Sequence, residues 1–266
     1  MPEGHTIHRA ARRLRSVLAG KRLERVEVRG ADLVQARTVQ RLRGATVTAV
    51  EARGKHLLIH VDNGLSIHSH LRMDGVWHLY QRGEKWRKSR RRAWLVLGAG
   101  DWDAVNFDGP ILELHRTDEL LRSRVITGLG PDVLVEPFDD LEYVRRMRAA
   151  GDREIGDAVM QQRIVAGIGN IYKAESLFLS GTDPWVRVDS LSNAELIAIR
   201  ETATRIMHDG VLDARAITFT GPGAPGQWAY GRAGLPCRRC GTPIASRKQG
   251  LDQRTTYWCP TCQSSG

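Results

Sequence analysis

Two pairs of cysteines near the end of the chain form the most specific chemical motif in the sequence. Cys237 and Cys240 are separated by two residues, and Cys259 and Cys262 repeat this spacing after a gap of 18 residues. Two such pairs can hold four thiolates tetrahedrally around Zn²⁺ at the tips of a β-hairpin. Two disulfides or a redox pair are the alternatives, although cysteines confined to the last 30 residues are not typical of a disulfide-rich secreted protein. We predict one structural Zn²⁺, which folds a segment too small to have a core of its own.

The start of the sequence offers a possible nucleophile. Removal of Met1 would expose the secondary amine of Pro2, and an α-amino group with a pKa of about 7.7–8.0 is partly neutral at pH 7. A neutral amine can attack an electrophilic sugar carbon and form an iminium ion. The adjacent Glu3 could act as the acid or base that opens the sugar ring. Proline at position 2 is common, so the pair is also compatible with a start that has no chemical role.

A glycine-containing turn in the middle of the chain could bind a phosphate. Gly167 and Gly169 permit a tight turn after one helix, and we expect Asn170 to cap the next helix. Exposed N–H groups at such a helix start, together with the Asn170 amide, would bind one phosphate. An ordinary helix–turn–helix packing corner is the alternative.

The charge balance favours a polyanionic partner. The chain has 40 Lys and Arg against 30 Asp and Glu, which gives a net charge of +10 and a pI near 9.9. Arg outnumbers Lys, and its planar guanidinium suits phosphate recognition. The basic run at 85–92 is either a DNA-facing loop or a solvated hairpin loop. Between the cysteine pairs, Arg247, Lys248 and Arg254 would place three cations at a hairpin tip suited to phosphate.

The elements that position these residues follow from hydrophobic periodicity. A helix at about 6–18 has Ile7, Ala11 and Leu14 on one face. The following β-prone or apolar runs are separated by Gly, Asp or Asn and occupy 25–29, 46–51, 56–61, 66–71, 76–80, 93–97 and 104–107. We therefore predict an N-terminal β-sandwich with a peripheral helix.

Turn-forming residues at 130–132 and 136–140 indicate a domain boundary, after which the pattern becomes helical. We expect helices at 141–149, 155–165, 172–179 and 193–208, and a Gly- and Pro-rich loop at 220–226. The overall class is α+β, with a catalytic β-sandwich domain at 1–135, a helical DNA-binding domain at 136–225 and a zinc finger at 226–266. No apolar run of 18 residues and no secretory signal are present, so we expect a cytoplasmic protein without a membrane span.

Taken together, these motifs resemble the formamidopyrimidine-DNA glycosylase/endonuclease VIII family over nearly the full length of the chain. The similar segments occur in the same order as in the family, at 1–4 (Met-Pro-Glu-Gly), 53–58, 130–134, 166–170 with Glu175, and 230–263. The resemblance implies a helix–two-turn–helix domain followed by a zinc-ribbon finger.

The resemblance also implies roles for individual residues. Pro2 would be the Schiff-base nucleophile and Glu3 the proton donor for base loss. Lys55 would assist sugar opening and β-elimination. Asn170 would bind a backbone phosphate, and Arg254 would bind phosphate and support δ-elimination.

A nucleotide that leaves the base stack leaves a gap to be filled. The segment at 70–75 resembles the family's loop that inserts into this gap, with Arg72 and Met73 as candidates. A Met in a strand-end loop is otherwise more often a core residue.

The resemblance implies a bifunctional DNA glycosylase/AP lyase of base excision repair that acts on damaged DNA as a monomer. Formamidopyrimidine enzymes typically carry an Arg-Arg-Phe-Gly loop, whereas the comparable stretch here is Asn106-Phe107-Asp108-Gly109. This departure favours an endonuclease VIII of the actinobacterial type. It also favours oxidised pyrimidines in duplex, single-stranded or bubble DNA.

Three other functions are compatible with parts of the sequence. A non-catalytic zinc-ribbon protein would need neither Pro2 nor Lys55. A tautomerase-like enzyme could use an N-terminal proline on a small molecule, but the zinc ribbon, the charge and the length argue against it. A degenerate family member would bind damage without cutting the strand.

Overall fold

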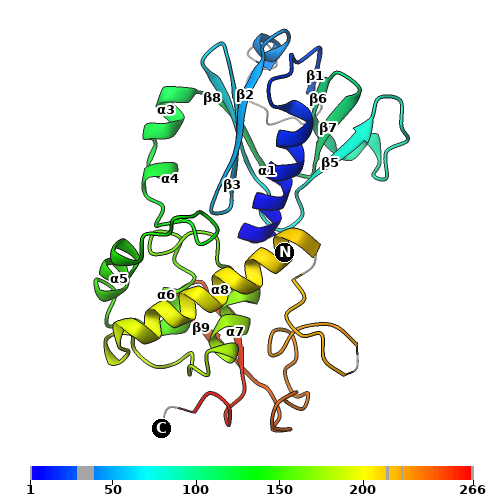
Figure 1. Cartoon of the computed structure of the whole chain (residues 1–266). Coiled ribbons are helices and arrows are strands. Elements are labelled where there is room, and N and C mark those ends of the chain that lie inside the picture. The colour runs from blue at the N-terminus through cyan, green and yellow to red at the C-terminus, as the bar shows by residue number, and fades with distance from the viewer. Residues whose placement is uncertain (1, 29–38, 214–215, 223, 265–266) are drawn as a thin grey trace. The chain divides into compact units, whose positions relative to one another are not determined.

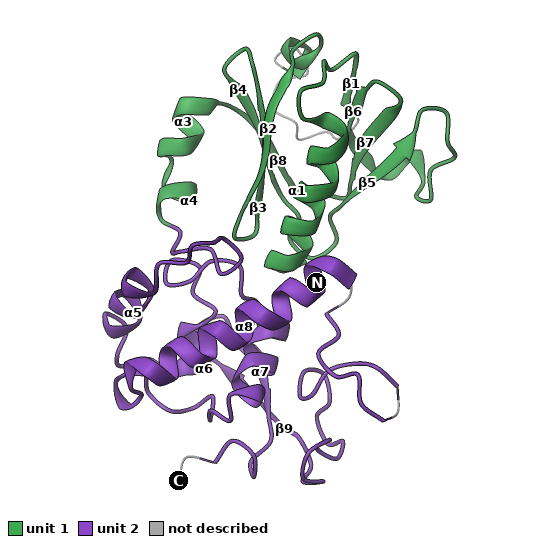
Figure 2. Cartoon of the chain, in the orientation of Figure 1, with its two compact units in different colours: residues 1–128 green, residues 129–266 purple. Residues whose placement is uncertain are grey.

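The computed structural model describes residues 2–28, 39–213, 216–222 and 224–264. The chain forms two compact units, Met1–Gly128 and Leu129–Gly266 (Figure 2). Met1, Arg29 at the end of the first predicted strand, and residue 223 in the predicted loop lie outside the described residues.

The N-terminal unit contains two four-stranded antiparallel sheets, which confirms the predicted sandwich (Figure 1). One sheet has the order β1 (Arg25–Val28), β6 (Ala93–Ala99), β7 (Trp102–Phe107) and β5 (Val76–Gln81). The other has the order β2 (Val47–Arg53), β3 (His56–Val61), β4 (Leu65–His70) and β8 (Ile111–Arg116). Strand β8 was not predicted, because its apolar residues do not alternate strictly; its pairing with β4 makes it a strand.

Helix α1 (Gly4–Leu18) confirms the predicted helix at 6–18. Its residues Ile7, Ala11, Leu14 and Leu18 recur at helical spacing, and each is at most 2% exposed in the main core of the unit. Arg15 anchors the helix to β2, since its Nε and Nη2 donate to the Val50 carbonyl at 2.9 and 2.6 Å. The last turn of α1 is therefore held against strand β2.

Two short helices after β8 were not predicted. Helix α3 (Thr117–Arg122) and helix α4 (Arg124–Thr127) pack Leu120 and Ile126 against Leu58 of β3. They thereby cover part of the face of the β2-β3-β4-β8 sheet that points away from the main core.

The C-terminal unit contains the predicted helices and a zinc-ribbon hairpin. Its helices are α5 (Asp140–Arg148), α6 (Ile155–Ala158), α7 (Asn170–Leu179) and α8 (Asn193–Asp213), and its hairpin strands are β9 (Ala245–Gln249) and β10 (Arg254–Trp258). Short 3-10 turns occur at Gln40–Leu42, Arg90–Arg92 and Val188–Ser190. None of the helices in the described ranges is long and apolar enough to cross a membrane.

The helix predicted at 155–165 is wrong in its extent, because α6 ends at Ala158. The Gln162 side chain bonds to the backbone of the turn that follows: its Nε2 donates to the Met160 and Ile168 carbonyls at 2.8 and 2.9 Å, and its Oε1 accepts from the Gly167 N–H at 3.0 Å. These bonds satisfy backbone groups that a continuous helix would have paired.

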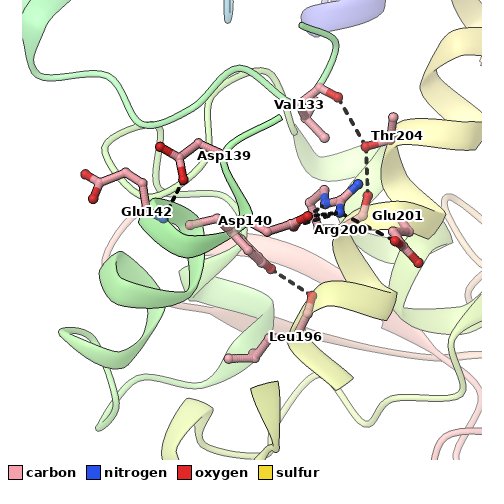
Figure 3. Close-up of polar contacts among 9 residues, drawn as sticks. Val133, Asp139, Asp140, Glu142, Leu196, Arg200, Glu201 and Thr204 are labelled. Atoms are coloured by element: carbon pink, nitrogen blue, oxygen red, sulfur yellow. Dashed lines mark hydrogen bonds and ion pairs between the residues drawn. The ribbon is translucent and has the colours of Figure 1, made fainter. Parts of the chain in front are cut away.

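Polar contacts join α5 to α8 (Figure 3). Arg200 of α8 donates from Nη2 to both carboxylate oxygens of Asp140 at 2.7 and 2.8 Å. Thr204 donates to the Val133 carbonyl at 3.1 Å, and Asp139 caps α5 by accepting from the Glu142 N–H at 2.9 Å. The long helix α8 is thus tied to the segment that begins the unit.

Candidate functional site

The candidate nucleophile and acid lie directly before α1. Glu3 is the N-cap residue with an extended backbone, and its carbonyl accepts from the N–H groups of Thr6 and Ile7 at 2.9 and 3.3 Å. Its side chain is completely buried, whereas Pro2 is only partly buried. The positive end of the α1 dipole points at this position and disfavours a positively charged group there.

His5 adds no positive charge beside Glu3 at neutral pH. Burial, followed by nearby positive charge that includes Arg9, lowers the pKa of His5 to about 4. The ring is also within hydrogen-bonding distance of Thr6, with His5 Nε2 and Thr6 Oγ1 separated by 3.2 Å.

Lys55 occupies the two-residue turn between β2 and β3. Arg53 of β2 lies opposite His56 of β3 in the strand register. Gly54 supplies the left-handed backbone (φ 58°) that this turn requires. Burial lowers the pKa of His56 to about 3, with further contributions from nearby histidines and from Lys55 and Arg72. The structure therefore brings the predicted residues Lys55 and Arg72 into the surroundings of one neutral imidazole.

The loop after β4 exposes the two predicted gap-filling residues. Arg72 has a left-handed backbone (φ 49°), and its N–H donates to His70 Nδ1 at 3.2 Å. Met73 is 54% exposed, so it is not a core residue. Gly75 closes the loop, because its N–H donates to the Leu71 carbonyl at 2.9 Å and a Cβ there would lie 2.7 Å from that carbonyl oxygen. This close backbone approach admits only glycine without a local shift.

The basic run at 85–92 is anchored to the unit by an aromatic residue. Trp86 is 9% exposed and stacks on Tyr80 with ring centroids 5.9 Å apart. Lys88 and Arg92 both bind Asp108, at 3.1 and 2.6 Å. The loop is therefore not a freely solvated hairpin, and the Asp108 carboxylate partly neutralises it.

The phosphate-binding turn differs from expectation in one respect. The N-cap of α7 is Gly169, so the prediction that Asn170 caps this helix is wrong. Asn170 is instead the first helical residue, is 7% exposed, and donates from Nδ2 to the Thr255 carbonyl at 2.9 Å. Gly169 adopts the extended backbone of an N-cap residue (φ -123°). The Asn170 amide thereby connects α7 to the finger hairpin.

The three basic residues of the hairpin have different surroundings. Arg247 stacks over the Trp185 ring at 3.6 Å, and Lys248 donates to Thr255 Oγ1 at 3.0 Å. Arg254 begins β10, is exposed, and directly precedes the residue that Asn170 contacts. Within the C-terminal unit, the structure therefore brings the start of α7, at Asn170, next to the start of β10, at Arg254.

The four cysteines fit a zinc ion. They are not joined by disulfides, and their sulfurs all lie within 4.8 Å of one another. The Cys237–Cys262 and Cys240–Cys259 sulfur separations are 3.9 and 3.4 Å, close to the roughly 3.8 Å expected for tetrahedral ligands with Zn–S bonds of about 2.3 Å. These four residues would hold one structural Zn²⁺, which would fix the end of the hairpin.

Sequence models of known families match most of the chain. The N-terminal domain of formamidopyrimidine-DNA glycosylase matches 1–108, its H2TH domain matches 129–220, and the zinc finger found in formamidopyrimidine-DNA glycosylase and isoleucyl-tRNA synthetase matches 234–264. A probable endonuclease 8 2 of Streptomyces coelicolor is 41% identical over 99% of this chain and 94% of its own length. The chain belongs to the formamidopyrimidine-DNA glycosylase/endonuclease VIII family.

Other members show where in the family the chain lies. The DNA-(apurinic or apyrimidinic site) lyase Nei2 of Mycolicibacterium smegmatis is 36% identical over the full length of both chains. A formamidopyrimidine-DNA glycosylase of Exiguobacterium is 32% identical over 99% of both chains. The resemblance to actinobacterial endonuclease VIII proteins is therefore confirmed.

The fold is similar to that of solved family members. The Lactococcus lactis formamidopyrimidine-DNA glycosylase, in complex with DNA that contains an N7-benzyl-Fapy-dG lesion, has a TM-score of 0.81 and 25% identity; the match covers 99% of this chain and all of that one.

The role of Glu175 in this family member was not predicted beyond its place in the motif. Its fully buried carboxylate accepts from the N–H groups of Trp228, Ala229 and Tyr230 at 2.8–2.9 Å, and from the Thr218 hydroxyl. The sequence signal that could have indicated this role is a carboxylate among the apolar residues of α7. Through these bonds, Glu175 holds the segment that leads into the zinc finger.

Loss of one zinc ligand should unfold the finger. We expect one Zn²⁺ per chain in the reduced protein as purified, and replacement of Cys259 by Ser should remove it, because three thiolates leave the tetrahedral site open. Elemental analysis and proteolysis of residues 234–264 measure these effects. Ser246→Ala, which lies in the same hairpin, is the control and should retain the metal. Purified protein without zinc would contradict the prediction.

Proposed function

We propose that the chain is a bifunctional DNA glycosylase/AP lyase of base excision repair, with the Pro2 nitrogen as the nucleophile. The observation that carries the proposal is the placement of a fully buried Glu3 directly between Pro2 and the start of α1. The names of the relatives support the same activity, since one is called a DNA-(apurinic or apyrimidinic site) lyase and others endonuclease 8.

The proposed reaction uses one nitrogen twice. After removal of Met1, the Pro2 amine attacks C1′ of the extruded nucleotide, and Glu3 supplies the proton that opens the sugar. The C1′–base bond then breaks, and the base leaves with the proton lost from the Pro2 nitrogen. The resulting iminium acidifies the C2′ hydrogens. Loss of one C2′ proton expels the 3′ phosphate by β-elimination. A second elimination then expels the 5′ phosphate and leaves phosphates at both ends of the gap.

Residues of the N-terminal unit assist these steps in the proposal. Lys55, at the β2–β3 turn, contacts a phosphate beside the lesion and assists ring opening and β-elimination. Arg72 and Met73 enter the gap left by the extruded nucleotide, as supported by the exposure of Met73. Because His56 and His70 are neutral at pH 7, with pKa values lowered by burial to about 3 and 4, Lys55 and Arg72 supply the positive charge here.

Residues of the C-terminal unit bind the DNA backbone in the proposal. Asn170 and the N–H groups at the start of α7 bind one phosphate, and Arg254 binds a second phosphate and supports δ-elimination. The chain then divides by role into a catalytic domain at 1–135, a DNA-binding domain at 136–225 and a zinc finger at 226–266. We further propose that it acts as a monomer in the cytoplasm.

The proposed range of damaged bases follows from the absence of arginine in one segment of the sequence. The segment 106–109 has no arginine, and its Asp108 is engaged by Lys88 and Arg92. Such a segment offers no cation to the strand opposite a lesion. Oxidised pyrimidines and abasic sites, in duplex, single-stranded or bubble DNA, are therefore the proposed substrates.

Borohydride trapping tests the proposed function. Incubation of the full chain, confirmed by mass spectrometry to lack Met1, with abasic-site DNA and borohydride should yield a covalent complex whose crosslink maps to Pro2. Protein that retains Met1 should not be trapped, because its Pro2 nitrogen is an amide. A crosslink on Lys55 with Pro2 unmodified would overturn the mechanism. DNA binding without any trapping would identify a damage-binding protein instead.

Replacement of Glu3 by Gln should separate base removal from strand cleavage. Excision of a damaged base should fall by about 10²–10⁴-fold because the variant lacks the general acid. Cleavage at a preformed abasic site should fall far less, since no base needs to be removed. Equal losses on both substrates would contradict the assigned role of Glu3.

The salt dependence of binding tests Arg254. Because each neutralised phosphate releases counterions, Arg254→Ala should weaken DNA binding and lower the slope of log K against log salt by about one unit. Arg145→Ala is a matched control: Arg145 is an exposed arginine on α5 paired with Glu142, and its loss changes the net charge equally. An unchanged slope in the Arg254 variant would exclude a backbone contact by this residue.

Lesion preference can be measured with the same protein. Single-turnover excision of an oxidised pyrimidine should be faster than excision of oxidised guanine paired with cytosine, because 106–109 lacks the arginines. A clear preference for the guanine lesion would place the activity with the formamidopyrimidine branch.

A further inference from the structure

Five of the nine histidines of the chain lie on one face of the β2-β3-β4-β8 sheet. They are His56 and His60 of β3, His68 and His70 of β4, and His115 of β8. Side chains alternate between the two faces of a strand, so residues two apart share a face. The register places Leu58, His68 and Glu113 side by side across three strands, and His60, Ser66 and His115 likewise.

Three side chains of this face converge on one point. His68 Nδ1 lies 2.9 Å and His115 Nε2 lies 3.2 Å from the same oxygen of Glu113, Oε2. All three ligand atoms lie within 4.8 Å of one another. Ligands bound tetrahedrally at about 2.0–2.1 Å would be roughly 3.3 Å apart, so the donors are already close to the spacing that a metal ion requires.

The supporting residues are also those of a metal site. The other ring nitrogen of His68, Nε2, lies 2.8 Å from His56 Nδ1. A metal-bound histidine usually makes a hydrogen bond through its second nitrogen, which fixes the ring orientation. The His68 side chain is 5% exposed, whereas those of Glu113 and His115 are 49% and 37% exposed. The buried ligand is therefore fixed, and an ion can enter from solvent with water as a fourth ligand.

The ligand atoms of the site determine which metal ions it prefers. Two imidazoles and one carboxylate suit zinc and neighbouring divalent transition metals, whereas Mg²⁺ and Ca²⁺ prefer oxygen ligands alone. Without an ion, both imidazoles can donate a proton to Glu113, and the same three side chains then form a hydrogen-bonded cluster. The ion-bound and ion-free states of the site can be distinguished by the metal content of the protein.

We propose that His68, Glu113 and His115 form a second, solvent-accessible zinc-type site in the N-terminal unit, distinct from the four-cysteine site of the C-terminal unit. The ion would replace the imidazole proton on His68 Nδ1 and move it to Nε2, where it would be donated to His56. The site thus adjoins the imidazole that follows Lys55, and occupancy of the site sets the tautomer of that imidazole.

Equilibrium dialysis of the full chain against Zn²⁺, with the finger loaded, tests the site. Elemental analysis should find two zinc ions per wild-type chain and one in His115→Ala and Glu113→Gln, because each substitution removes a proposed ligand. His208→Ala, which removes an exposed histidine of α8, is the matched control and should keep two.

A spectroscopic measurement separates this site from nonspecific binding. Nitrogen NMR of the histidine side chains should show His68 Nδ1 shifting on addition of zinc, with no shift in Glu113→Gln. Circular dichroism checks that both variants are folded. A wild-type chain that saturates at one zinc, or variants that keep the second ion, would overturn the proposal.

Discussion

The alternation of side chains along paired strands is the constraint on which the N-terminal unit depends. In β3 and β4, Leu57, Ile59 and Ile67 fill the main core, and the alternate positions carry four histidines and Leu58 to the opposite face. A slip of one residue would exchange the two sets. Hydrophobic burial therefore fixes the register, and the register in turn fixes the turn that presents Lys55 and the strand end that presents Arg72.

The C-terminal unit depends on buried polar groups in a comparable way. Glu175 satisfies three backbone N–H groups of the segment before the finger, and a buried carboxylate without those partners would be costly. Lys173, which is 1% exposed, donates to Thr256 of the hairpin at 2.7 Å. One short helix therefore holds the zinc finger through Glu175 and Lys173, whose polar groups would be costly to bury without partners.

The histidine rings around the β2–β3 turn carry no charge at neutral pH. Burial lowers the pKa of His56 to about 3 and of His70 to about 4, so both rings remain uncharged. A polyanion approaching this surface meets the basic side chains of Lys55 and Arg72 among neutral imidazoles. Salt would weaken that attraction by screening the charges.

The sequence by itself determined the sandwich, the principal helices, the glycine turns and the four metal ligands. Each of these rests on a local pattern: two-residue or helical periodicity, a residue that permits a left-handed backbone, or a fixed cysteine spacing. Only the tertiary structure determined that Asn170 contacts Thr255, 85 residues away, that β8 is a strand, and that His68 meets Glu113. The physical reason is that these contacts depend on which distant strands and helices pair, and a local pattern contains no record of that pairing.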